Sequence, residues 1–100
     1  MKSKRKPRHP GAFIREVYLE PFAGKVSRSV IAQHLMVSRS TFNRLVNEEA
    51  DLSPEMALRL SSVLGGEPEK WLAMQSAYTL WETRQSMDLS KVKPIDLSSY

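Results

Sequence analysis

Between Phe13 and Trp81, apolar residues recur along the chain at the three- and four-residue spacing that is typical of amphipathic helices. Proline and glycine divide this pattern into short segments, and three serines stand where a helix N-cap would be placed, at Ser27, Ser38 and Ser53. The pattern predicts an all-α chain. Its five expected helices are Gly11–Leu19, Arg28–Leu35, Arg39–Asn47, Pro54–Leu64 and Pro68–Arg84.

The third expected helix has two faces of very different chemistry. Phe42, Leu45 and Val46 share one side and are expected to point into a core, as are Val30, Ile31, Ala32 and Leu35 of the preceding helix. The opposite side holds only side chains that donate or accept hydrogen bonds, without any acid or large apolar group. These outward-facing residues are Ser40, Asn43, Arg44 and Asn47, with Arg39 beside them.

Two short helices joined by a tight turn at Met36-Val37 predict a helix-turn-helix unit. In such a unit the second helix lies in the major groove of DNA. A plain helical hairpin within a bundle is the alternative, and the absence of acids from Gly24 to Asn47 argues against it, because a solvated helix face normally mixes both signs of charge.

The side chains of this unit suggest separate roles on DNA. Arg28 and Ser38 are placed to reach phosphates at helix N-termini, Arg39 and Arg44 suit guanine, and Asn43 suits adenine. Ser40 and Thr41 could bond to a base or to a phosphate. The predicted DNA-binding residues are therefore Arg28, Ser38, Arg39, Ser40, Thr41, Asn43 and Arg44.

The fifth expected helix carries an apolar stripe that covers nearly half of its circumference. A stripe of this width exceeds what burial in a small core needs, so part of it is expected to serve a second protein surface. We predict a homodimer that is formed around Trp71, Tyr78 and Trp81.

Composition sets the domain boundaries. The 100 residues suit one domain, and the net charge of +4 is unevenly spread. Met1–Arg8 holds five cations and no acid, Lys25–Asn47 holds four cations and no acid, and Glu48–Tyr100 holds nine acids against five bases. We expect a basic, flexible N-terminal arm at residues 1–9, a DNA-binding and dimerisation domain at 10–86 and an extended tail at 87–100. The arm is either a DNA contact or a solubilising tail.

Several classes of function are disfavoured. There is no cysteine, neither His9 nor His34 has a second ligand at metal spacing, and no nucleophile or phosphate-binding motif is present, so neither an enzyme nor a cofactor or metal site is expected. No apolar run is long enough to cross a bilayer, and the basic start lacks the hydrophobic segment of a secretory signal. A cytoplasmic protein without a membrane partner is expected.

Three blocks of sequence resemble the HigA/VapI antitoxins, within the Xre (lambda-repressor-like) helix-turn-helix group. They are HPGAFIRE at His9–Glu16, IAQHLMVSRSTFNRLVN at Ile31–Asn47, and the longer block Leu52–Glu82. The resemblance implies a five-helix lambda-repressor-like fold and a homodimer that represses its own promoter at a palindromic operator. It also implies neutralisation of a HigB/RelE-like toxin that cleaves mRNA.

The chain departs from that family at three places. Met36 occupies a turn position where glycine is usual, Glu48-Glu49 replaces a Gly-Lys pair, and Glu67 replaces the usual Ser or Thr cap. Two other functions stay open from the residues alone. One is a stand-alone phage- or plasmid-type regulator without a toxin, and the other is an interaction module whose helix-turn-helix is vestigial.

Overall fold

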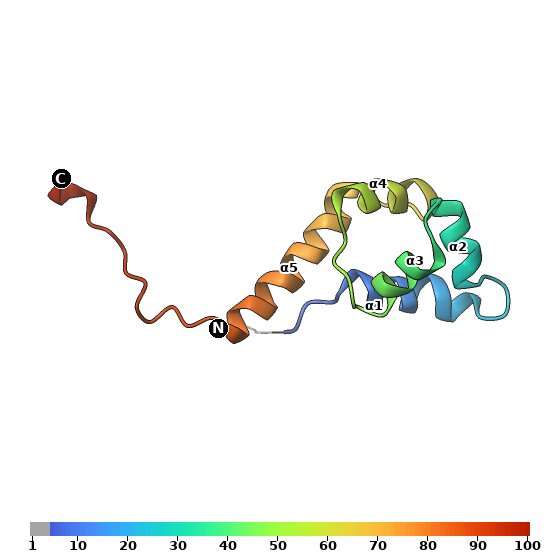
Figure 1. Ribbon diagram of the computed structural model, residues 1–100, viewed down its shortest axis with the longest axis horizontal. Coiled ribbons are helices and arrows are strands. Elements are labelled where there is room, and N and C mark those ends of the chain that lie inside the picture. Colours follow the sequence, from blue (N-terminus) through green and yellow to red (C-terminus); the bar gives the residue numbers. More distant parts are fainter. Residues whose placement is uncertain (1–4) are drawn as a thin grey trace.

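The computed structural model describes residues 5–100, and Met1–Lys4 lie outside this range. Within it the chain is all-α with five α-helices and no strand, which confirms the expected fold class. The first four helices pack together into one small body (Figure 1). α5 extends away from this body and is followed by the C-terminal segment. The α-helices are α1 (Pro10–Ile14), α2 (Arg28–Leu35), α3 (Arg39–Val46), α4 (Pro54–Val63) and α5 (Pro68–Ser86).

The three serine caps form as predicted. The Oγ atoms of Ser27, Ser38 and Ser53 accept hydrogen bonds from backbone N–H groups three residues later, at the starts of α2, α3 and α4. Each bond satisfies one of the backbone donors that a helix leaves unpaired at its first turn. Glu67, by contrast, gives α5 no side-chain cap.

The first helix differs from its expected form. Only Pro10–Ile14 is α-helical, after which the chain continues as a π-helical turn, Arg15–Leu19, and a 3-10 turn, Glu20–Phe22. Pro21 lies within the first turn of that last element. A proline is tolerated there because the N–H that it lacks has no helical partner at that position.

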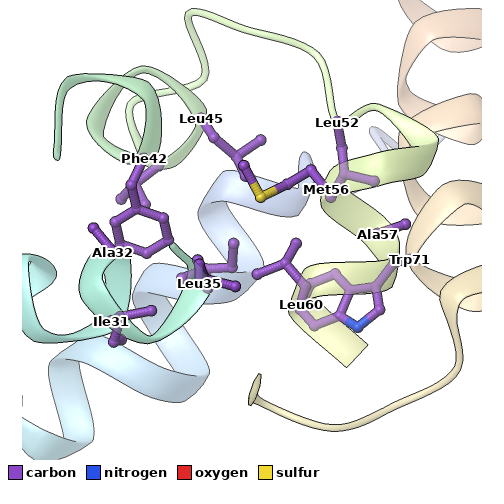
Figure 2. Close-up of a cluster of buried hydrophobic side chains, with 12 residues drawn as sticks. Ile31, Ala32, Leu35, Phe42, Leu45, Leu52, Met56, Ala57, Leu60 and Trp71 are labelled. Carbon is purple, nitrogen blue, oxygen red and sulfur yellow. The ribbon is translucent and has the colours of Figure 1, made fainter. Parts of the chain in front are cut away.

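The core lies where α2, α3 and α4 meet. Figure 2 shows Phe42 of α3 packed over Ala32, with Leu35 and Leu60 between it and the indole of Trp71. Phe42, Leu45 and Val46 are at most 2% exposed, which confirms the predicted inward face of α3. Val30 is 42% exposed, so its expected place in the core was wrong. It lies about 200° around the helix from Ala32, on the flank that faces away.

The amino end of α1 packs directly on the carboxyl end of α3. A Cβ atom at Gly11 would lie 2.1 Å from the carbonyl oxygen of Leu45 and 2.9 Å from that of Val46. No side chain fits in this gap, since both neighbours are backbone atoms. Glycine at this position therefore sets how closely the two helices approach.

His9 belongs to the folded body, although residues 1–9 were expected to form a flexible arm. Its side chain is 3% exposed, and its Nδ1 atom accepts a hydrogen bond from the backbone N–H of Gly11, which caps α1. Burial lowers the pKa of His9, while nearby carboxylates, chiefly Glu48, act in the opposite direction. A buried imidazole with an accepting Nδ1 is neutral and carries its proton on Nε2.

The segment after α5 projects away from the body (Figure 1). It is not helical until the 3-10 turn Leu97–Ser99 at its end. Every large apolar side chain in it is more than half exposed: Met87, Leu89, Val92, Ile95, Leu97 and Tyr100.

The turn between α2 and α3 depends on an unusual backbone conformation. Met36 adopts the left-handed conformation, with φ 59° and ψ 44°, while its side chain is 81% exposed. Arg59 of α4 supports this turn, because its Nη1 donates to the carbonyl oxygens of Leu35 at 2.8 Å and Met36 at 3.5 Å. Left-handed backbone costs a residue with a side chain about 1–2 kcal/mol.

We predict that Met36→Gly raises the free energy of unfolding by about 0.5–1 kcal/mol. Glycine removes the left-handed strain and loses almost no packing, although part of this gain is offset by the greater entropy of glycine in the unfolded chain. Urea denaturation followed by circular dichroism measures the change. Met36→Ala is the matched control, since it shortens the side chain but keeps the strain, and it should leave stability nearly unchanged.

Candidate nucleic-acid interface

The outer face of α3 is a continuous polar surface. Phe42, Leu45 and Val46 fix the rotation of this helix by entering the core, and the rest of its circumference is thereby turned outward. Asn43 is half-buried, and the remaining outward residues are exposed: Ser38, Arg39, Ser40, Thr41, Arg44 and Asn47.

Arg39 and Arg44 keep their charges unpaired. Neither guanidinium forms an ion pair with any residue of the described range 5–100. Both side chains are exposed on α3, one at its first residue and the other in its last turn. They are therefore free to make the bidentate hydrogen bonds by which arginine binds guanine or phosphate.

Arg28 connects the two helices of the unit. From the first position of α2, its Nη1 lies 3.0 Å from Oδ1 of Asn47 and 3.4 Å from Oδ1 of Asn43. Both acceptors are neutral amides, so the guanidinium keeps its full positive charge. The bonds also orient the two amides, whose NH₂ groups are left facing away from the arginine.

Ser38 and Thr41 are engaged with each other. Ser38 Oγ accepts from the Thr41 backbone N–H at 3.0 Å and donates to Thr41 Oγ1 at 2.8 Å. The primary role of Ser38 in this structure is therefore to cap α3.

Arg15 holds the other end of α3. One terminal nitrogen of its guanidinium donates to the carbonyl oxygen of Val46, and the other lies 2.9 Å from Oε2 of Glu48. Glu48 follows α3 with a positive φ of 63° and would otherwise place a free carboxylate beside the polar face. The ion pair neutralises that carboxylate, whereas the Glu49 side chain has no ion pair within residues 5–100.

An open depression of about 350 Å³ lies beside the amino end of α2. Arg15, Arg28 and Ser27, the residue that caps α2, line one part of it. The rest of the lining consists of the acid Glu20 and the apolar residues Leu19, Ala23 and Val26. Arg28 and the amino end of α2 favour an anion, whereas Arg15 is already paired with Glu48 and Glu20 adds a negative charge. The side of the depression near Arg28 is therefore the part suited to a phosphate group.

Sequence reasoning missed two residues that position this surface. Arg15 and Arg59 each bind backbone carbonyls more than twenty residues away, at the end of α3 and at the turn before it. The spacing of neighbouring residues in the sequence does not predict hydrogen bonds between residues so far apart along the chain.

Of the three residues predicted to form the dimer surface, the structure buries one, Trp71. Trp71 is 4% exposed, and its Nε1 donates to the Gly65 carbonyl oxygen at 3.0 Å, so it is a core residue with no surface for a partner. The expectation for Trp71 was therefore wrong, because α4 and the segment after His9 cover that part of α5. Tyr78 and Trp81 are half-buried, and their place in a dimer surface stays a prediction.

Residues 5–100 contain neither a metal-binding cluster nor a membrane-spanning helix. No cluster of three or more His, Asp or Glu side chains within residues 5–100 could hold a metal ion. No helix in that range is long and apolar enough to cross a membrane.

Comparison with known proteins places the chain in a family. No family model matches it. It is 33% identical to antitoxin HigA-1 of Vibrio cholerae over 99 residues, which cover 97% of this chain and 91% of the other. It is 42% identical to virulence-associated protein I of Dichelobacter nodosus over 72 residues, which cover 72% and 65% of the two chains.

Solved structures agree with these relatives. Antitoxin GraA in complex with its operator superimposes with a TM-score of 0.82 at 31% identity, covering 96% of this chain and 98% of the other. The Pseudomonas aeruginosa antitoxin HigA with the higBA promoter gives 0.76 at 29% identity, covering 90% and 99%. HigA-1, GraA and the Pseudomonas aeruginosa HigA are all named as antitoxins. The similarity to HigA-1 along nearly the whole chain shows that the chain belongs to the HigA family of helix-turn-helix antitoxins.

Proposed function

We propose that this chain is an antitoxin that binds the operator of its own promoter through α3. The observation that carries the proposal is the pair of unpaired arginines on a helix face without acids, Arg39 and Arg44. A face of this kind fits the major groove, where arginine reads guanine. Two of the structural neighbours are described with operator or promoter DNA, which supports the same reading.

The other groups have supporting roles in the proposal. Arg28 and the amino end of α2 bind the DNA backbone and so fix the register of α3. Asn43, held by Arg28, reads a base edge near the middle of the helix. Ser38, Ser40 and Thr41 contribute phosphate or base contacts at its amino end.

We predict that Arg39→Ala and Arg44→Ala each weaken binding to the promoter fragment upstream of the gene by about 5- to 150-fold, as loss of one good base contact implies. Fluorescence anisotropy with labelled DNA at fixed salt measures the change. Arg84→Ala is the matched control, because it removes one exposed cation from α5 without altering α3. Equal affinities for all three variants would refute the proposal and favour a vestigial helix-turn-helix.

We further propose a homodimer that forms through the projecting part of α5. An open groove of about 540 Å³ runs along this helix, lined by Leu72, Gln75, Ser76, Thr79, Leu80 and Thr83. Leu80 is 50% exposed at one edge of it. A second copy of this helix supplies a complementary surface by two-fold symmetry, and a dimer would place two α3 helices on half-sites about one DNA turn apart.

The expected result for Leu80→Glu is a monomer at micromolar concentration, since two carboxylates would face each other near the dimer axis. Sedimentation equilibrium should give twice the chain mass of 11.4 kDa for the unmodified protein. Leu58→Glu serves as the control, because Leu58 is a leucine of similar exposure, 59%, on α4 and away from the groove. A monomeric unmodified chain would contradict the dimer.

The antitoxin role is proposed to rest on a second partner, a HigB/RelE-like toxin that cleaves mRNA. The residues from Glu48 to Tyr100 hold nine acids against five bases, a balance that suits a basic protein. A stand-alone regulator is the second candidate, and it is supported by a relative that is 38% identical over 93 residues and described as an HTH-type transcriptional regulator of Escherichia coli.

Co-expression separates these two candidates. We expect the tagged chain to co-purify with the product of the adjacent gene, which should be a small basic protein, and to relieve the growth arrest that this product causes alone. An adjacent gene of another kind, or a product that neither binds nor arrests growth, would favour the stand-alone regulator.

A further inference from the structure

An aromatic pair on α5 holds a cation of the same chain. Tyr78 and Trp81 lie about one turn apart, with ring centroids separated by 6.4 Å and planes inclined by 38°. The Nζ atom of Lys6 lies 5.7 Å from the centroid of Tyr78 and 5.4 Å from that of Trp81. Both distances are within the range at which an aromatic face attracts an ammonium group.

Tyr78 packs against the folded body, whereas Lys6 lies at the surface. The edge of the His9 ring packs against Tyr78 with centroids 4.9 Å apart and an interplanar angle of 82°, and His9 is itself buried. Lys6 is exposed and precedes His9 by three residues. Its long side chain can therefore leave the rings while His9 continues to cap α1.

Carboxylates make the surroundings of the pair negative. Burial raises the pKa of Tyr78, and the negative charges of Glu82 and then Glu48 raise it further, with a hydrogen bond to Glu82. Asp51 and Glu82 also act on the adjacent His9. Glu82 is therefore the carboxylate with the largest effect on Tyr78, and Glu48 contributes although it is paired with Arg15.

We propose that Tyr78 and Trp81 form a docking site for a lysine or arginine side chain of a basic protein partner, which Lys6 occupies in the free chain. This rests on the proposed function only in taking the partner to be a basic protein. The partner's cation takes the place of the Lys6 ammonium group, so the two rings face a positive charge both before and after binding. Arginine is favoured over lysine, because its planar group stacks on both rings and is less strongly hydrated.

Lys6→Met tests the site directly, because it empties the rings of their own cation and keeps a side chain of similar length. The probe is the acetylated, amidated tripeptide Gly-Arg-Gly, titrated into the full chain labelled with nitrogen-15. The indole N–H signals of Trp81 and Trp71 are followed by NMR. The buried Trp71 provides an internal reference.

We expect the peptide to shift the Trp81 signal and leave the Trp71 signal in place. Its apparent dissociation constant should fall about two- to fivefold in Lys6→Met, which is the factor that one exposed cation–π contact represents. Lys70→Met is the matched control, since Lys70 is an exposed lysine of the same helix without a place on the rings, and it should bind as the unmodified chain does. The peptide Gly-Glu-Gly should give no shift.

Equal affinities for Lys6→Met and Lys70→Met, or equal shifts of both indoles, would overturn the docking site. Trp81→Leu keeps apolar bulk on α5 and should abolish binding while the thermal midpoint of unfolding stays close to that of the unmodified chain. Persistent peptide binding in this folded variant would also overturn it. The operator assay on the unmodified chain tests the proposed function separately, because it does not depend on Lys6 or Trp81.

Discussion

The contact of α1 with the carboxyl end of α3 is the constraint on which the geometry of the proposed DNA-binding face depends. Gly11 allows the two backbones to meet, and Arg15, one turn later, binds the last carbonyl of the helix. At the other end, Ser38 caps α3 and Arg59 supports the turn before it. The helix is thereby fixed at both termini by groups that themselves lie outside its exposed face, so its outward side chains remain available.

The electrostatics of the unit follow a consistent rule. Where a cation is needed on the surface, its partners are neutral, as for Arg28 with Asn43 and Asn47. Where an acid lies beside this surface, an arginine of another element forms an ion pair with it, as Arg15 does with Glu48. The unusual Glu48-Glu49 pair is consequently less unfavourable for a polyanion than its sequence suggests, since one of the two charges is cancelled within the fold.

Local signals predicted the parts of the structure that depend on neighbouring residues. Serine caps and the two-sided pattern of α3 act over three or four positions, so α2, α3 and α4 were placed correctly from the sequence. Features that depend on contacts between residues far apart in the chain could not be predicted from the sequence. The burial of His9 and Trp71 requires the approach of α1 and α5, and the bonds of Arg59 reach from α4 to the turn at Met36. The exposure of Val30, by contrast, follows from helical periodicity, because this residue lies about 200° around α2 from the buried Ala32.

The different surroundings of the two tryptophans give the molecule two optical reporters. Trp71 lies in the core with its indole N–H bound to a carbonyl, so its emission will respond to loss of tertiary packing. Trp81 lies half-buried under the ammonium group of Lys6, near the projecting end of α5, and its emission will respond to what occupies that end. Single-tryptophan versions of the chain would therefore report unfolding and surface occupancy as separate signals, without an added dye.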